Sequence, residues 1–432
     1  MSAKMSRRTS FYCLILLATL CVFFIALNQR YSSYIEYRLQ PILSEAELRS
    51  RLKYQEPFLV PTVKYDDPFL SYMRASYSIE NMTLLEIAEV VEQQRRAIEK
   101  EMEDYVYPNG KYGVYANKLE DLVMEKNGNP VRSVIVTTWR SGSTFLGDIL
   151  NSHPANFYHY EPLLHFGIIQ IRESPLSDEA LDDLDSMFKC DYSTLERYLS
   201  FGKNSHPWVF NHNTHLWKQC QLHKRICWDH RFVSKFCKLF PFQSMKIVRI
   251  RLKPMERFLE QNELGIRMVL LIRDPRGVLQ SRKHRQWCPT EPDCFDPAAL
   301  CSDMVADYHA AVTFSKLYPD SFRVIRYEDL SVEPYVNTQK LFEFYGLNFH
   351  DNVREFLDSH TKIDIGGLSS TFRNSKTAPF HWRAQLDYEE VEEIQQECNL
   401  AMRLWGYAFA HNASHQRYFD PVIDFKLRKN DV

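Results

Sequence analysis

Residues 131–152, VRSVIVTTWRSGSTFLGDILNS, predict a strand, a tight polar loop and a helix in direct succession. The strand is indicated by residues 134–136, a β-branched run of the kind found in buried parallel strands. The helix is indicated by apolar side chains at helical spacing, which are Phe145, Leu146, Ile149 and Leu150. We expect the rest of the domain to be organised around this unit.

The loop between the strand and the helix is suited to bind an anion. It consists of Arg140, Ser141, Gly142, Ser143 and Thr144. Small residues at the start of a helix leave backbone N–H groups open to an anion, and the helix dipole adds to the attraction. Arg140 can donate two hydrogen bonds to a tetrahedral group. The loop lacks the Lys of an ATP-binding P-loop, and an N-capped helix without a ligand would share its pattern.

Strands and helices alternate along the remainder of the chain. Further strands are predicted at residues 156–160, 246–251, 268–272 and 322–326. Helices are predicted at residues 178–188, 193–199, 298–317, 337–345 and 388–404. The alternation predicts an α/β fold, P-loop-like and three-layered, with a central parallel sheet and the site at the carboxyl ends of its strands.

A second anion-binding segment is LLIRDPRGVLQSR, residues 270–282. Its buried strand ends at Arg273, and Pro275 suits the first turn of a helix in which Ser281 lies two turns on. Arg273 and Ser281 together could bind one phosphate group. A Walker B strand with Asp274 on Mg²⁺ is an alternative, although Arg273 would repel the metal. A helix-capping Asp beside solvated arginines is another.

At this point the chain resembles the Golgi carbohydrate sulfotransferases. The branch it resembles sulfates the 6-position of galactose, N-acetylgalactosamine or N-acetylglucosamine. The matching motifs are TTWRSGSTFLGDILNSHP, FYHYEPLLH, LLIRDPRGVLQSR, RYEDL and TFRNSKTAPFHWRAQL. They occur in the family's order and cover about residues 131–405.

The resemblance implies the sulfate donor 3′-phosphoadenosine 5′-phosphosulfate (PAPS), a glycan or proteoglycan acceptor and no metal. The 5′-phosphosulfate would be held by Trp139, Arg140, Ser141, Gly142, Ser143, Thr144 and Phe145. Arg273 and Ser281 would bind the 3′-phosphate. Arg373 and Ser375 would close over the nucleotide or contact the acceptor.

The resemblance gives Arg140 a catalytic role, and the position of two further residues beside the loop makes them candidates for the base. Arg140 would neutralise the charge that develops on the bridging oxygen as the sulfuryl group leaves. Glu161, at the end of the second predicted strand, is the first candidate for the base that accepts the sugar hydroxyl proton, and His165 is the second. Glu161 could instead orient an arginine. A luminal P-loop kinase and a catalytically silent glycan-binding relative are the alternative functions.

The N-terminal region predicts a membrane anchor. Residues 11–27 are an uninterrupted apolar run, about 26 Å long as a helix, which suits a thin early-secretory membrane. Basic residues within segment 1–10 place that tail in the cytosol and the remainder in the lumen. We therefore expect a single-pass type II protein of the Golgi membrane. A cleaved signal peptide is the alternative, but no good cleavage site follows the run.

Residues 28–130 are predicted to form a luminal stem, and residues 131–432 the catalytic domain. Within the stem, residues 82–106 predict a helix with a partial apolar face, which could form a homodimer or pack on the domain. Sequons at Asn81 and Asn412 agree with a luminal location.

Composition restricts the partners and the compartment. The net charge of −2 gives no general basis for nucleic-acid binding. Ten cysteines fit an oxidising compartment, with a disulfide expected within residues 288–301, and zinc is the alternative. Residues 203–249 are basic and contain Trp208, Trp217 and Trp228. They would suit an anionic glycan, or form an aromatic core with a basic surface.

Overall fold

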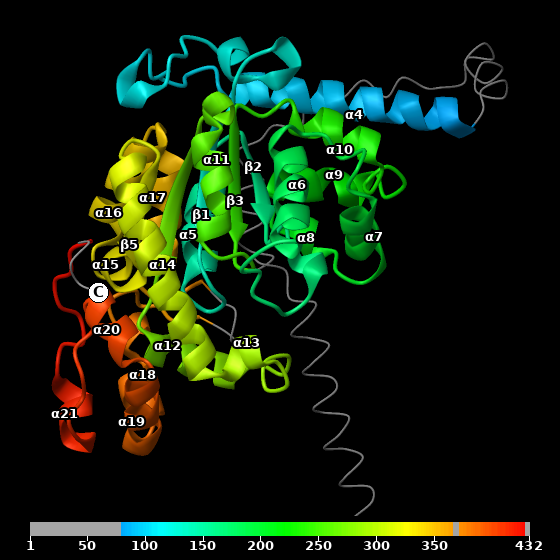
Figure 1. The fold of residues 1–432 in the computed structure, drawn as a ribbon. Coiled ribbons are helices and arrows are strands. Elements are labelled where there is room, and N and C mark those ends of the chain that lie inside the picture. Colours follow the sequence, from blue (N-terminus) through cyan, green and yellow to red (C-terminus); the bar gives the residue numbers. More distant parts are fainter. Residues whose placement is uncertain (1–78, 366–370, 428–432) are drawn as a thin grey trace, which may run out of the picture. The chain divides into compact units, whose positions relative to one another are not determined.

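The central strand of the fold is β1, Val131–Val136, as predicted. The computed structural model describes residues 79–365 and 371–427. Five parallel strands form one sheet in the order β2-β3-β1-β4-β5 (Figure 1). The other four are β2 (Asn156–Tyr160), β3 (Phe242–Ile247), β4 (Ile266–Ile272) and β5 (Phe322–Arg326). The predicted parallel sheet is therefore confirmed.

The position of β1 explains why its loop is a good place for a site. Its neighbours are β3 on one side, with Ile135 opposite Lys246, and β4 on the other, with Ile135 opposite Val269. The strand order reverses at β1, so the loop after it lies at a topological switch point. Ligands of open α/β sheets bind in the crevice at such points.

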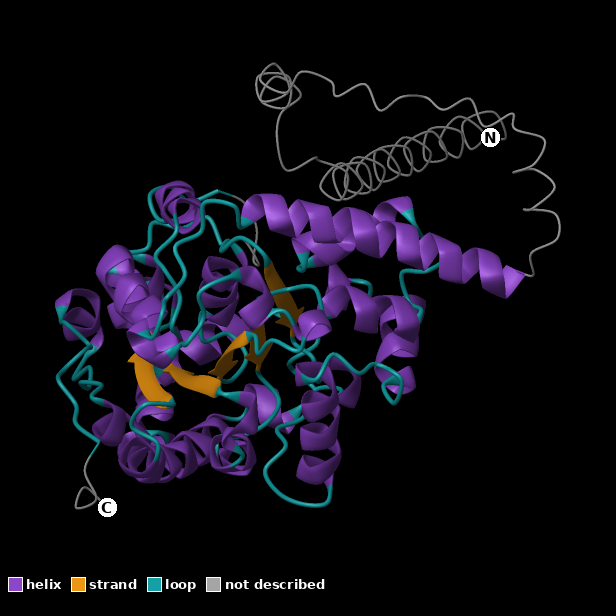
Figure 2. Ribbon diagram, turned by 90° about the horizontal axis from the view of Figure 1, so that it is seen from above, coloured by secondary structure: helices purple, strands orange, loops and turns teal. Residues whose placement is uncertain are grey.

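Helices lie on both sides of the strands (Figures 1 and 2). From the first to the tenth helix of the described chain they are α4 (Ile79–Glu101), α5 (Ser143–Asn151), α6 (Leu176–Phe188), α7 (Glu196–Asn204), α8 (Trp208–Asn211), α9 (Thr214–Leu222), α10 (His230–Cys237), α11 (Glu256–Glu260), α12 (Pro275–Lys283) and α13 (Pro292–Phe295). They continue with α14 (Pro297–Leu317), α15 (Tyr327–Val332), α16 (Pro334–Tyr345), α17 (Asp351–His360), α18 (Trp382–Gln385), α19 (Tyr388–Glu397), α20 (Asn399–Trp405) and α21 (Ala413–Tyr418). The α/β class is therefore confirmed.

Several predicted boundaries were wrong. The helix predicted at 193–199 is α7, which ends at Asn204, and the helix predicted at 82–106 is α4, which ends at Glu101. Two further errors have a visible tertiary cause. The strand predicted at 246–251 is β3, which ends at Ile247, and the chain beyond it leaves the sheet so that Arg249 can donate to the Gly167 carbonyl. The helix predicted at 388–404 is broken into α19 and α20 at Cys398, which forms a disulfide with Cys301. Both breaks depend on contacts with distant segments.

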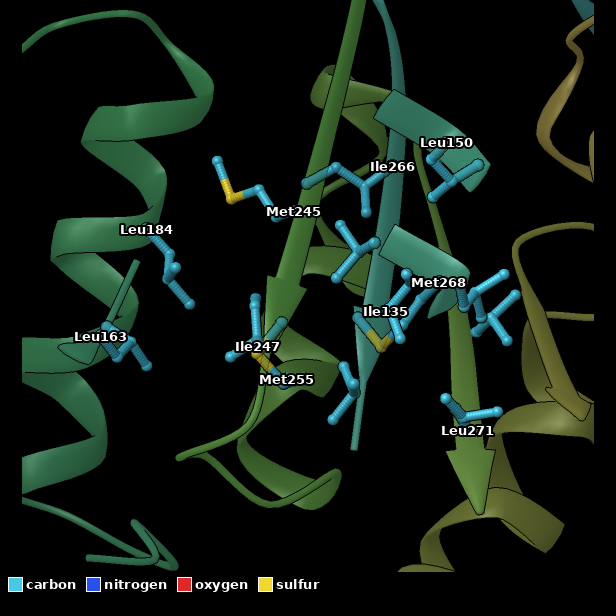
Figure 3. Close-up of a cluster of buried hydrophobic side chains, with 14 of the residues drawn as sticks. Ile135, Leu150, Leu163, Leu184, Met245, Ile247, Met255, Ile266, Met268 and Leu271 are labelled. Carbon is cyan, nitrogen blue, oxygen red and sulfur yellow. The ribbon is translucent and has the colours of Figure 1, made fainter. Parts of the chain in front are cut away.

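The core lies between the sheet and its helices. Ile135 and Met268 come from neighbouring strands. Leu150 of α5 lies on their side of the view, whereas Leu184 of α6 lies on the opposite side, nearer β3 (Figure 3). All four side chains are buried almost completely. This burial fixes the strand ends that carry the site.

Helix α4 corresponds to the helix predicted in the stem. Its residues Ile87, Val90, Val91 and Ile98 are buried, and α4 packs against α10. Much of its apolar face is thus covered by the same chain. The predicted anchor at 11–27 lies outside the described residues. In the described part, none of the helices is both long and apolar enough to cross a membrane.

Four disulfides join all eight cysteines of the described segments. They are Cys190–Cys237, Cys220–Cys227, Cys288–Cys294 and Cys301–Cys398. The bridge expected within residues 288–301 is Cys288–Cys294. This pattern fits an oxidising compartment.

A buried carboxyl group joins the ends of β4 and β5. Glu328 Oε1 accepts a hydrogen bond from the Asp274 backbone N–H at 3.0 Å, and Oε2 accepts one from the Tyr407 hydroxyl at 3.0 Å. Burial, together with the nearby Asp274 carboxylate, raises the pKa of Glu328 to about 7. The folded protein therefore favours the protonated form.

This pKa predicts how stability depends on pH. Because the folded pKa lies above the unfolded value, the stability contributed by protonated Glu328 is present below pH 4.5 and is lost as pH rises through about 7. In wild type, the free energy of unfolding should fall between pH 5 and 8 by up to roughly 3 kcal/mol because of this group. The Glu328→Gln variant should lose this fall, so its Tm should change less between the two pH values. Thermal unfolding against pH measures it, with the exposed Glu397→Gln change as control. An equal Tm difference from wild type at both pH values would contradict the prediction.

Candidate active site

A cavity of about 900 Å³ opens at the carboxyl ends of the strands. Its lining comes from the β1–α5 loop, the ends of β2 and β3, the α7–α8 region, the C-terminal half of α12, α15 and residues 371–385. The volume is within the range of small-molecule sites. These elements are distant in sequence, and the parallel sheet brings them to one edge.

The β1–α5 loop has an unusual backbone. Arg140 and Gly142 both adopt left-handed conformations, with φ of 68° and 88°. A Cβ atom at Gly142 would lie 2.1 Å from Tyr327 Cδ2, so only glycine fits there. Gly142 caps α5 at its N-terminus, and the first-turn N–H groups of a helix lack intrahelical acceptors. Gly142, Ser143, Thr144 and Phe145 line the cavity.

The two predicted anion-binding segments meet directly. Arg140 Nε donates to Ser281 Oγ at 2.9 Å, and Arg273 Nη1 donates to the Arg140 carbonyl at 2.8 Å. Arg273 lies over the Tyr327 ring, and its Nε is buried without a hydrogen-bond partner in the described chain. Burial, and then the charges of Arg285 and Arg273, lower the pKa of Arg140 to about 10. Crowded, buried cations of this kind favour an anionic ligand.

Arg282 holds the loop in place, and the sequence did not point to it. Its guanidinium is buried, and it donates to the Trp139 carbonyl at 3.2 Å, to Thr138 Oγ1 at 2.7 Å and to the Cys294 carbonyl at 2.8 Å. Burial lowers the pKa of Arg282 to about 9. The only sequence feature that could have drawn attention to Arg282 was its neighbour Ser281. The position of Arg282 in a predicted helix does not reveal that its side chain points inward.

Glu161 is enclosed by two cations that the sequence also missed. Lys246 Nζ donates to Oε1 at 2.8 Å, and Arg249 Nη1 donates to Oε2 at 2.6 Å. Burial alone would raise the pKa of Glu161, but Lys246 and Arg249 hold it well below its usual range. The carboxylate is therefore ionised. Its side chain is 14% exposed, and its backbone is left-handed, with φ of 46°.

His165 lies deeper than Glu161. Its Nε2 contacts Asp183 Oδ2 at 2.9 Å, and its side chain has no exposed surface. The ring packs against Phe166 and Tyr198. Although His165 belongs to the cavity lining, these contacts suit a residue that supports the wall.

The other predicted residues divide into two groups. The side chain of Ser141 is turned into the loop, where its hydroxyl contacts Thr137 Oγ1 at 2.6 Å and the Thr138 carbonyl at 2.9 Å. Only its backbone could serve a ligand. Trp139, Arg373 and Ser375 line the cavity.

Only one tryptophan of the basic segment 203–249 reaches the cavity. Trp208 belongs to the lining. Trp217 packs against the core, and Trp228 stacks on Phe210 at 4.3 Å. The neighbouring His212 stacks on Tyr160 at 3.7 Å. The aromatic-core interpretation therefore holds for two of the three tryptophans.

The left-handed conformation of Gly142 and its close contact with Tyr327 lead to a testable prediction. Gly142→Ala should displace the loop, because the added Cβ meets the Tyr327 ring, and should weaken donor binding at least about 10-fold. The matched control is Gly265→Ala, which shares the left-handed strain of about 1–2 kcal/mol but meets only Asn129 Nδ2, at 3.7 Å. Donor titration by calorimetry and Tm measure both effects. Equal donor affinity in the two variants would contradict the prediction.

Comparisons with known proteins agree with this geometry. The family model described as "Sulfotransferase domain" matches residues 130–406. Carbohydrate sulfotransferase 4 of Mus musculus is 27% identical over 335 residues, covering 68% of this chain and 86% of the relative. Carbohydrate sulfotransferase 5 of Mus musculus is 26% identical, with 69% and 86% covered. Carbohydrate sulfotransferase 6 of Homo sapiens is 25% identical, with 66% and 83% covered. The chain belongs to the sulfotransferase domain family.

Proposed function

We propose that this protein transfers the sulfuryl group of PAPS to a sugar hydroxyl, at the 6-position of galactose, N-acetylgalactosamine or N-acetylglucosamine in a glycan or proteoglycan. The observation that carries the proposal is the Arg140–Ser281 hydrogen bond, which joins two anion-binding segments in one cavity. A nucleotide with charged groups at both ends needs two such segments. The names of the relatives support a carbohydrate acceptor.

The residues present fit this donor. Arg273 Nε is a buried donor without a partner in the described chain, and with Ser281 it would bind the 3′-phosphate. The N-terminus of α5 and Arg140 would bind the 5′-phosphosulfate. PAPS supplies an activated sulfuryl group, whose bond to the bridging oxygen breaks as a bond to the sugar oxygen forms. Arg140 would stabilise the charge on that oxygen.

Glu161 is the proposed proton acceptor. It is ionised and partly exposed, whereas the His165 side chain is fully covered. Its two ion pairs make it a weak base. Glu161 becomes a stronger base if one of these ion pairs breaks. Lys246 or Arg249 would then pair with another anion, such as a sulfuryl oxygen of the bound donor.

We also propose that the protein is a single-pass type II membrane protein of the Golgi with a luminal catalytic domain. The four disulfides support an oxidising compartment. The apolar residues of α4 that are buried within the chain are not available to a second copy. A homodimer through the stem would therefore have to use other surfaces.

The first experiment measures transfer itself. The full-length chain is incubated with ³⁵S-labelled PAPS and a panel of keratan, chondroitin and N-acetylglucosamine-terminated oligosaccharides, in the presence of EDTA. Label on one acceptor class supports the proposal and names the acceptor. Donor binding without label on any acceptor would favour a silent relative, and transfer of phosphate from ATP with Mg²⁺ would favour a kinase.

Arg140 and Arg273 should give different kinetic losses. Arg140→Ala should reduce turnover at least about 100-fold without unfolding the domain, since it removes charge stabilisation at the leaving oxygen. Arg273→Ala should mainly raise the donor KM. Steady-state kinetics and Tm measure these effects, and the exposed Arg417→Ala on α21 is the control. Near-normal turnover in Arg140→Ala would refute the leaving-group role.

Glu161 and His165 should also be separable. Glu161→Gln should lower kcat about 100-fold or more without weakening donor binding, because the amide cannot accept the proton and leaves Lys246 and Arg249 in place. His165→Asn should instead lower Tm, since it removes the Asp183 contact from a buried wall. Calorimetric donor binding, kcat and Tm distinguish the two. Unchanged turnover in Glu161→Gln would exclude Glu161 as the base.

A further inference from the structure

One buried carboxyl group beside the donor site has no role in the proposed transfer. Glu328 is the second residue of α15 and belongs to the RYEDL motif, residues 326–330. It is 1% exposed, so it does not bind a ligand itself. Its contacts nevertheless lead to both parts of the donor site. The inference drawn from them rests on the proposed function and concerns how Glu328 affects donor binding.

Glu328 holds the corner at which Arg273 leaves the sheet. Strand β4 ends at Ile272, and Asp274 is the N-cap of α12, so Arg273 occupies the turn between the two elements. The Asp274 backbone N–H donates to Glu328 Oε1 at 3.0 Å. This N–H belongs to the peptide group that joins Arg273 to Asp274. The bond therefore fixes the backbone from which the Arg273 side chain extends.

The residue before Glu328 contacts both anion-binding segments. The Arg273 guanidinium lies 4.9 Å from the centroid of the Tyr327 ring. The same ring covers Gly142, where an added Cβ would lie 2.1 Å from Tyr327 Cδ2. A displacement of α15 at Glu328 would thus move the surface against which Arg273 and the β1–α5 loop pack.

Glu328 forms no ion pair with a cation in the described chain. Its second oxygen, Oε2, accepts a hydrogen bond from the Tyr407 hydroxyl at 3.0 Å. The neighbouring Asp274 carboxylate is instead bound by the Arg276 guanidinium at 2.7 Å. Burial and a nearby carboxylate both disfavour a second negative charge. Burial, and then the charge of Asp274, raise the pKa of Glu328 to about 7.

The other charged and titratable groups near Glu328 come from several elements. They are Asp274 and Arg276 at the start of α12, Arg326 at the end of β5, Asp329 of α15, which is paired with Arg326, and Tyr407 beyond α20. On α16 the charged side chains are exposed, and the turn Ala378–Phe380 has no titratable side chain. Arg273 is the cation whose charge lowers the pKa of Glu328. The charges of Arg273 and Glu328 are therefore coupled.

Ionised Glu328 and a bound phosphate compete for the charge of Arg273. When Glu328 is ionised, its negative charge offsets part of the attraction that Arg273 exerts on an anion. A phosphate group bound to Arg273 has the converse effect, because it adds negative charge near a buried carboxyl group and favours its protonated form. Both effects express one coupling free energy, since linkage between two binding equilibria is reciprocal.

We propose that Glu328 is a positioning residue of the donor site, and that its carboxyl group takes up a proton when the donor binds. The proton comes from solvent and returns to it when the nucleotide product leaves. The donor binds the protonated form more tightly. Donor affinity is therefore at its full value below about pH 7 and falls as the pH rises through the range in which Glu328 titrates.

The test measures how adenosine 3′,5′-bisphosphate, the desulfated form of the donor, binds to the full-length chain at several pH values. The Glu328→Gln variant keeps an oxygen for the Asp274 N–H but cannot ionise. Between pH 6 and 8 the association constant of wild type should fall about 5-fold relative to that of Glu328→Gln. Comparing the two proteins at each pH cancels the titration of the nucleotide phosphates and of the cavity histidines. The exposed control Glu397→Gln should follow wild type.

Two further measurements distinguish this role from a purely structural one. Calorimetry in buffers of different ionisation enthalpy counts protons, and near pH 7 wild type should take up a larger fraction of a proton per nucleotide than Glu328→Gln does. Tyr407→Phe removes a hydroxyl that donates to Glu328, so the pH at which affinity falls should move upward. A residue that only supports the fold would alter Tm without altering proton uptake.

The outcomes separate this inference from the proposed function. An affinity ratio between wild type and Glu328→Gln that is the same at pH 6 and 8, with equal proton uptake, would overturn the coupling and leave sulfuryl transfer intact. If Glu328→Gln does not fold, Tyr407→Phe decides, and an unmoved pH dependence in that variant would overturn the proposal. Absence of nucleotide binding at every pH would overturn the proposed function and this inference with it.

Discussion

The active-site region depends on one buried guanidinium. Arg282 is 1% exposed, and its hydrogen bonds in the described chain all go to carbonyl or hydroxyl oxygens, not to a carboxylate. Asp303 and Asp293 lie near enough to favour the charge but do not bond to it directly. Burial of such a charge costs several kcal/mol, so the oxygens must be held in place. The Cys288–Cys294 disulfide closes the segment that presents the Cys294 carbonyl, and β1 leads directly to Thr138. One side chain thus links the sheet, α12 and the disulfide loop.

Several positively charged side chains line the cavity in the protein without a ligand. Arg140 and Arg273 meet at the β1–α5 loop, and Lys246 and Arg249 share Glu161. The backbone is strained at the same places, since Arg140 and Glu161 are both left-handed. Strained backbone persists where the surrounding structure holds it and where function uses the geometry. A site built this way is prepared for multiply charged ligands and is stabilised by binding them.

Much of the fold and part of the site were predictable because their signals are local. The strand–loop–helix at 131–152, the strands at 156–160 and 322–326, and the segment ending in Arg273 and Ser281 each follow from periodicity and turn chemistry. The signals failed where a distant contact decided the outcome. β3 began four residues earlier than predicted, and the last long helix was interrupted at Cys398 by its disulfide with Cys301. Neither partner is visible in a short window of sequence.

The sequence by itself determined the α/β class, the parallel sheet and the positions of the two segments predicted to bind anions, because these depend on residue spacing within short stretches. The tertiary structure alone decided that the two segments touch through Arg140 and Ser281, that Ser141 turns away from the cavity and that Glu161 is held by Lys246 and Arg249. The physical reason is that burial and charge pairing are properties of elements brought together by the sheet. A lysine within a strand does not reveal its partner until the neighbouring strand is in register.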